Sequence, residues 1–168
     1  MNVSHTARHA VAALAVASTF ASGAALAGPA NAPFKATLVT QEALSPDISA
    51  CQAFPFLAGT TVGTGHASHL GAVTGTGTDC FNPTMTGQYF FSNGKLTMIT
   101  MNGDELRADY GGTLTPTGTA QIYTISGTYR ITSGTGRFAM ATGSGTLLGV
   151  ENIKTLQGQL NFAGTISY

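Results

Sequence analysis

The 168-residue sequence has no tryptophan, and only 8% of its residues are charged, compared with roughly a quarter in an average soluble domain. Seven Lys and Arg balance seven Asp and Glu, so the chain has no net charge to attract a nucleic acid or an anionic membrane surface. Helix-favouring Glu, Lys, Leu and Gln are scarce, whereas the 22 glycines are outnumbered by threonines. This composition excludes a helical bundle, a Rossmann-type α/β domain and a disordered charged tail, and leaves an all-β domain.

Residues 1–27 are typical of a secretory signal peptide. Arg8 supplies a positive charge, residues 10–20 are apolar, and Ala25-Leu26-Ala27 has small residues where signal peptidases cut. The apolar run is too short for a membrane anchor, which needs about 20 residues. We therefore expect an exported protein, periplasmic or secreted, whose residues 28–168 form a single domain without a membrane span.

The chain has two cysteines, Cys51 and Cys80. A disulfide between them would persist in an oxidising compartment, and closing a loop of about 30 residues would contribute roughly 3.5 kcal/mol in a chain-entropy description. Two buried free thiols are the alternative. His66 and His69 lie nearby, but no CxxC or HxxxH spacing supports a metal site. The Gly-x-Gly pairs lack a following helix and a GK[ST] motif, so we also expect no nucleotide cofactor.

Segments of strand-forming residues alternate with Gly, Asn, Asp and Pro turns at a spacing typical of a barrel or sandwich. Asn93-Gly94 predicts a type I′ hairpin turn, because both central residues of that turn need a positive φ. Residues 42–57, which contain two prolines, predict an irregular loop. The predicted strands are 34–41, 60–66, 68–79, 87–92, 95–101, 105–114, 121–132, 143–151 and 155–166, with 60–66 and 68–79 forming either a pair or one bent strand.

Two segments alternate between apolar and polar residues, which indicates one buried and one solvated face. One apolar face carries Leu156, Leu160, Phe162 and Ile166, and the other carries Leu106, Ala108 and Tyr110. Residues 96–101 are apolar on both faces, so we expect the barrel interior on one side and a neighbouring subunit on the other. About eight antiparallel strands would close into an all-β barrel that side chains can fill or that can hold one small ligand.

Residues 131–143 read ITSGTGRFAMATG. This segment resembles the GGTGxFxxAxG signature of plant dirigent proteins and allene-oxide-cyclase-like barrels, and more closely a GGTGRFxxATGSGT signature of small secreted bacterial proteins. Residues 65–71 (GHASHLG) and 101–106 (MNGDEL) also fit that bacterial group. The resemblance implies a closed antiparallel barrel and a homo-oligomer, often a trimer. Ser133 replaces the first glycine of the signature.

The same segment has a predicted structural role. Gly134 and Gly136 would allow a tight corner, and Phe138 would plug the barrel or pack beneath it. Arg137 would bind nearby carbonyl groups or a carboxylate.

Five side chains are candidates for ligand binding. The tyrosine hydroxyls could line a cavity, although packing in the core explains them equally well. A histidine could face inward, and a hydrogen-bonded structural role is its alternative. The two arginines could hold an anionic group or instead bridge Asp79, Asp104 or Glu151 across the barrel mouth. The candidates are His69, Tyr110, Tyr129, Arg130 and Arg137.

The sequence is most consistent with an exported small-molecule-binding or structural barrel, whose partner would be a small apolar ligand. A dirigent- or cyclase-like enzyme that steers a reactive small apolar substrate is one alternative, and an envelope or surface protein-interaction module is another. An enzyme-like barrel should enclose a cavity of several hundred Å³. A structural barrel should be filled by Leu, Phe and Ile, and an interaction module should expose an apolar patch on residues 96–101.

Overall fold

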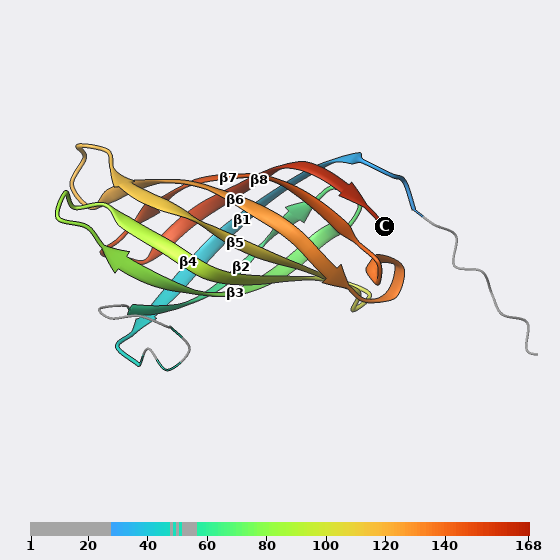
Figure 1. Cartoon of the computed structure of the whole chain (residues 1–168), viewed down its shortest axis with the longest axis horizontal. Helices are drawn as coiled ribbons and strands as arrows, with labels where there is room; N and C mark the ends of the chain where they lie inside the picture. The colour runs from blue at the N-terminus through green and yellow to red at the C-terminus, as the bar shows by residue number, and fades with distance from the viewer. Residues whose placement is uncertain (1–27, 48, 50, 52–56) are drawn as a thin grey trace, which may run out of the picture.

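The computed structural model describes residues 28–47, 49, 51 and 57–168, and its eight strands close into one antiparallel barrel (Figure 1). Each strand pairs with its neighbour in the chain, and the last strand pairs with the first. The predicted all-β, closed antiparallel barrel of about eight strands is confirmed. The strands are β1 (Ala32–Ser45), β2 (Leu57–Ala67), β3 (Gly71–Pro83), β4 (Tyr89–Thr100), β5 (Glu105–Pro116), β6 (Ile122–Gly134), β7 (Thr142–Asn152) and β8 (Gln157–Ser167).

The predicted signal peptide, residues 1–27, lies outside the described residues. In the part of the chain that is described, no helix is long and apolar enough to cross a membrane.

The predicted hairpin turn at Asn93-Gly94 is wrong, because β4 runs through it. Asn93 has a φ of 55° but Gly94 does not share the positive φ that a type I′ turn requires. The pairing of β4 with β5 instead shifts between Phe91 and Gly94. A single left-handed residue therefore produces a β-bulge, and two predicted strands become one.

The predicted loop at residues 42–57 begins too early. Strand β1 continues to Ser45, because Glu42 to Ser45 pair with residues 58–61 of β2. The segments 60–66 and 68–79 are a pair rather than one bent strand, and the turn between them includes His69 with a φ of 67°.

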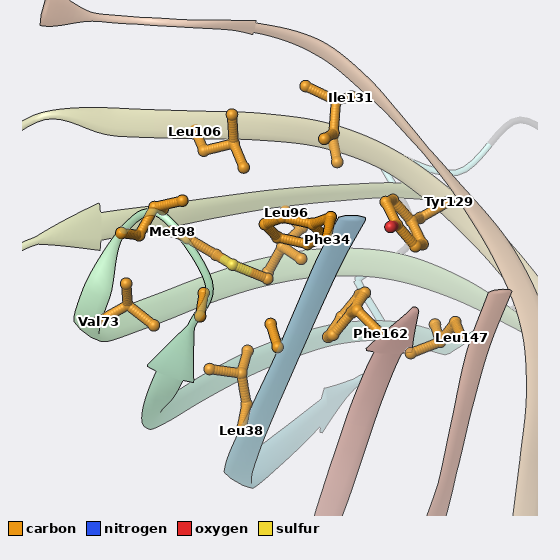
Figure 2. Close-up of a cluster of buried hydrophobic side chains, with 14 of the residues drawn as sticks. Phe34, Leu38, Val73, Leu96, Met98, Leu106, Tyr129, Ile131, Leu147 and Phe162 are labelled. Carbon is orange, nitrogen blue, oxygen red and sulfur yellow. The ribbon is translucent and has the colours of Figure 1, made fainter. Parts of the chain in front are cut away.

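Alternation along the strands builds the core, as predicted for β5 and β8. Leu106, Ala108, Phe162 and Ile166 are all buried, and the close-up in Figure 2 shows large side chains of several strands filling the barrel. Many inward positions of β2, β3, β7 and β8 are glycines. A Cβ at Gly145 would collide with the Ala163 carbonyl of the next strand, so these positions make room for tightly coiled strands as well as for large side chains.

In residues 96–101, the side chains of this chain cover the inner face of the strand but not its outer face. Leu96 and Met98 point inward and are buried, whereas Ile99 is half-buried on the outer face. A neighbouring subunit over the outer face remains a prediction.

One end of the barrel is closed by residues 131–143, the segment that resembles the dirigent signature. A short 3-10 helix, η1 (Gly136–Phe138), begins at a left-handed Gly136 with a φ of 55°. Phe138 is fully buried and its ring lies 4.9 Å from that of Tyr168. Arg137 donates a hydrogen bond to the His69 carbonyl. The predicted corner, plug and carbonyl contact are therefore confirmed at this end, which is marked by the C-terminus in Figure 1.

The predicted disulfide between Cys51 and Cys80 is present. It joins the connection between β1 and β2 to the buried end of β3, at the barrel end opposite to η1. The bond closes a loop in the unfolded chain and so reduces its conformational entropy, which is the main way in which a disulfide stabilises the folded state.

Replacing Cys51 and Cys80 together with alanine should lower the free energy of unfolding by about 2–4 kcal/mol, measured by urea denaturation. A reductant added to the wild-type protein is the matched control, since it opens the same loop without changing a side chain. A double variant as stable as the oxidised protein would show that the cross-link contributes nothing.

Candidate functional site

The end of the barrel opposite to η1 contains a pocket with three inward-facing carboxyl groups. Glu42 comes from β1, Asp79 from β3 and Glu151 from β7. The strands between them present glycines: Gly59 of β2 pairs with Asp79, and Gly158 of β8 pairs with Glu151. Because glycine has no side chain, carboxyl groups from every second strand can approach one another across it.

These carboxyl groups are buried and incompletely hydrogen-bonded. Glu42, Asp79 and Glu151 are only 9%, 7% and 8% exposed. The Tyr110 hydroxyl donates to Asp79 Oδ2 over 2.9 Å, and Thr61 Oγ1 lies 3.5 Å from Glu42 Oε1. Asp79 Oδ1 has no hydrogen-bond partner among the residues that the structure describes. An unsatisfied buried oxygen is rare in folded proteins and is a feature that function can explain.

Burial changes the protonation of the cluster. It raises the pKa of Glu42 to about 9, with further contributions from the nearby charges of Glu151 and Asp79. Burial also raises the pKa of Asp79 to about 6, although the hydrogen bond from Tyr110 opposes this. The pKa of Glu151 is raised by burial as well, while its hydrogen bond with Glu42 lowers it. At neutral pH Glu42 therefore holds a proton beside a mostly ionised Asp79.

Apart from Thr40 and Thr61, the remaining walls of the pocket are apolar and partly aromatic. The rings of Phe81 and Phe91 are 6.3 Å apart, and those of Phe91 and Tyr110 are 6.0 Å apart, so three aromatic rings follow one another along the wall. The cavity has a volume of about 40 Å³, room for roughly three water molecules. Its other lining residues are Thr40, Thr61, Leu114, Ile125, Leu147 and Leu160.

Below this pocket the barrel is nearly solid. An adjoining cavity of about 10 Å³ shares Thr40, Thr61, Tyr110 and Leu160 with it. Cavities of these sizes are far below the several hundred Å³ expected of an enzyme-like barrel that encloses a whole substrate. The pocket can therefore surround a small end group, and the rest of a bound molecule would extend away from the filled interior, towards the barrel end opposite to η1.

The structure places two of the predicted ligand-binding residues inside the barrel. Tyr110 lines the pocket. Tyr129 is buried deeper, with its ring packed against those of Phe34 and Phe162 (Figure 2). Among the described residues its hydroxyl has no hydrogen-bond partner. Burial raises the pKa of Tyr129 to about 12, so the hydroxyl keeps its proton at neutral pH.

The other three predicted residues lie elsewhere. His69 is in the turn at the closed end, where Nε2 lies 3.0 Å from the Pro33 carbonyl oxygen, and Arg137 lies beside it. Arg130 is on the outer surface, 74% exposed and 3.7 Å from Asp109.

The predicted arginine bridges are therefore wrong. Within the described chain, neither Arg130 nor Arg137 pairs with Asp79, Asp104 or Glu151. For Arg130 the reason is that successive side chains of a strand point to opposite faces. Arg130 lies between the inward-facing Tyr129 and Ile131, so its side chain points out of the barrel.

Sequence reasoning missed the three carboxyl groups as a site, although alternation carried a signal. Asp79 follows Val73, Gly75 and Gly77 at intervals of two residues, and Glu151 lies four residues after Leu147, so the alternation places them on the same strand faces as these residues. Each therefore belongs to the inner face of its strand. Glu42 lies in the segment predicted as a loop, where no alternation of inner and outer faces is expected.

In the residues that the structure describes, no three His, Cys, Asp or Glu side chains are arranged to hold a metal ion. The polar side chains that line the pocket carry three carboxyl groups, one phenol and the hydroxyls of Thr40 and Thr61. No protein-family model, no curated protein and no solved structure matches this chain.

Proposed function

We propose that this protein is an exported barrel that binds a small, mainly apolar molecule by its polar end group. The site is the acidic pocket, which comprises Glu42, Asp79, Glu151 and Tyr110 with the apolar side chains around them. One observation supports this most strongly: Asp79 lines the pocket and is 7% exposed, and among the described residues its Oδ1 has no hydrogen-bond partner.

A barrel with a purely structural role has no need of this arrangement. Leaving a buried acceptor without a partner costs about 1–3 kcal/mol, and more when the group is charged. Well-packed apolar residues would stabilise the same position better than unpaired acids do. A cost of this kind at the mouth of a pocket supports a binding role.

The disulfide supports the part of the proposal that concerns export. A disulfide such as Cys51–Cys80 persists in the oxidising compartments of exported proteins. Assembly into a trimer and kinship with the dirigent-like barrels remain predictions from the resemblance.

Filling the pocket should abolish binding. Leu160 is half-buried and lines the cavity, so Leu160→Phe should weaken the binding of hexan-1-ol and hexan-1-amine at least tenfold, followed by NMR titration. The matched control is Leu148→Phe, because Leu148 is 53% exposed on the outer face of β7. Near-UV circular dichroism checks that both variants fold. The proposal fails if neither probe binds the wild-type protein, or if both variants bind them as the wild type does.

A dirigent- or cyclase-like enzyme is the second candidate, and one observation favours it. Glu42, with its pKa raised to about 9, can donate a proton, while Asp79, with a pKa of about 6, can accept one; paired acids with separated pKa values are typical of acid–base catalysis. A molecule that co-purifies unchanged with Glu42→Gln, but as a converted product with the wild-type protein, would identify an enzyme by native mass spectrometry.

A further inference from the structure

The acidic pocket also indicates what kind of end group it accepts. Resting on the proposed function, we propose that the ligand is a primary amine, bound as its ammonium ion among Glu42, Asp79 and Glu151, with a narrow apolar body directed towards the barrel end opposite to η1.

The charges of the pocket have one sign. Its titratable groups are three carboxyls and a phenol, contributed by β1, β3, β7 and β5. The intervening strands contribute Thr61, Phe91, Ile125 and Leu160, none of which titrates. Among the described lining residues there is no Lys, Arg or His, so no protein cation neutralises the cluster. A cationic ligand would supply the missing partner.

The free oxygen requires a donor. Asp79 Oδ2 already accepts from Tyr110, whereas Oδ1 accepts no hydrogen bond from any described residue. Asp79 Oδ1 and Glu42 Oε1 both lie within 2.8 Å of the position that a Cβ of Gly59 would occupy. Two acceptors thus converge on one side of this glycine. A primary ammonium carries three N–H donors on one atom and can satisfy both, whereas a hydroxyl has a single donor.

The walls and the volume select a slender cation. The aromatic rings of Phe81, Phe91 and Tyr110 line the cavity in sequence, and aromatic rings attract an ammonium group. A cavity of about 40 Å³ can exchange its water for a methylene-ammonium end. A trimethylammonium group is too bulky and has no N–H to donate, so the site should discriminate against it.

The release of protons from the pocket carboxyl groups provides a second measurement that tests the inference. An ammonium ion favours the ionised carboxyls and should displace protons from Asp79 and Glu42, whose pKa values are raised by burial in the folded protein. Alkylamines keep their own proton up to about pH 10, as lysine does. Amine binding should therefore strengthen between pH 5.5 and 8 and release protons, whereas binding of a neutral alcohol should not.

The experiment is isothermal titration calorimetry with hexan-1-amine, hexan-1-ol and hexyltrimethylammonium at pH 5.5 and pH 8. Two buffers of different ionisation enthalpy measure the protons released. The variants are Asp79→Asn and Glu151→Gln, each of which removes one charge without changing the size of the side chain. The matched control is Glu105→Gln, because Glu105 pairs with Arg107 on the outer face of β5.

We expect hexan-1-amine to bind the wild-type protein at least tenfold more tightly at pH 8 than at pH 5.5, and at least tenfold more tightly than either other probe. Both pocket variants should weaken amine binding at least tenfold, and Glu105→Gln should not. Hexan-1-ol binding as tightly as the amine would overturn the inference but leave the proposed function intact. Absence of binding by every probe would overturn both. If Asp79→Asn fails to fold, the inference is tested by Glu151→Gln and by the pH dependence: unchanged amine binding in Glu151→Gln, or equal binding at pH 5.5 and pH 8, would overturn it.

Discussion

Replacing Phe138 with alanine is expected to lower the free energy of unfolding by about 3–5 kcal/mol. Phe138 is fully buried and packs against Tyr168 at the closed end of the barrel. Its removal would leave a cavity between η1 and the ends of β5 and β6, which η1 contacts. Urea denaturation followed by circular dichroism measures the loss.

Met140→Ala is the matched control for this substitution. Met140 follows Phe138 in the same turn but is 84% exposed, so its replacement should change the stability by less than about 0.5 kcal/mol. Equal losses in the two variants would show that Phe138 does not close the barrel by packing.

The second large effect is a loss of stability as the pH rises. The pKa values of Asp79 and Glu42 are raised on folding, to about 6 and about 9, so both groups resist ionisation in the folded state. Their contribution is fully present below the unfolded pKa values, near 4, and is lost as the pH rises through the folded ones. Asp79 alone represents roughly 3 kcal/mol, at about 1.4 kcal/mol per pKa unit.

Chemical denaturation at pH 5, 7 and 9 should therefore give the highest stability at pH 5. Glu42→Gln mimics the protonated acid, so this variant should lose much less stability between pH 7 and pH 9, while Glu105→Gln should behave as the wild-type protein does. The exposed Asp109 has a lowered pKa because Lys95 donates to it, and its small contribution is lost only in acid. A protein more stable at pH 9 than at pH 5 would contradict the buried cluster.

The fold was largely predictable because its signals are local. Alternation in β5 and β8 identified the buried Leu106, Ala108, Phe162 and Ile166. The glycines of the segment at residues 131–143 marked the corner, and Phe138 followed as its plug. Two cysteines with no competing motif predicted the disulfide. Each of these inferences needs only neighbouring residues or a choice between two partners.

The errors arose where a local signal has two structural outcomes. Asn93-Gly94 favours positive φ, which serves a hairpin turn or a bulge equally well, and the neighbouring β5 decided for the bulge. Pro46 indicated a loop in the correct region, but the pairing of Glu42 with Thr61 extended β1 beyond the predicted end. Both outcomes depend on cross-strand hydrogen bonds, which no single segment contains.

By itself the sequence determined an all-β barrel with its inner and outer faces, its disulfide and its plugged corner, since strand period and turn residues are properties of short segments and two cysteines allow only one pairing. Only the tertiary structure decided the site. Glu42, Asp79 and Glu151 are far apart in the chain and meet because closure of the barrel sets Gly59 and Gly158 between their strands. The register of a closed sheet is a property of the whole chain, and so is the burial that gives these acids their chemistry.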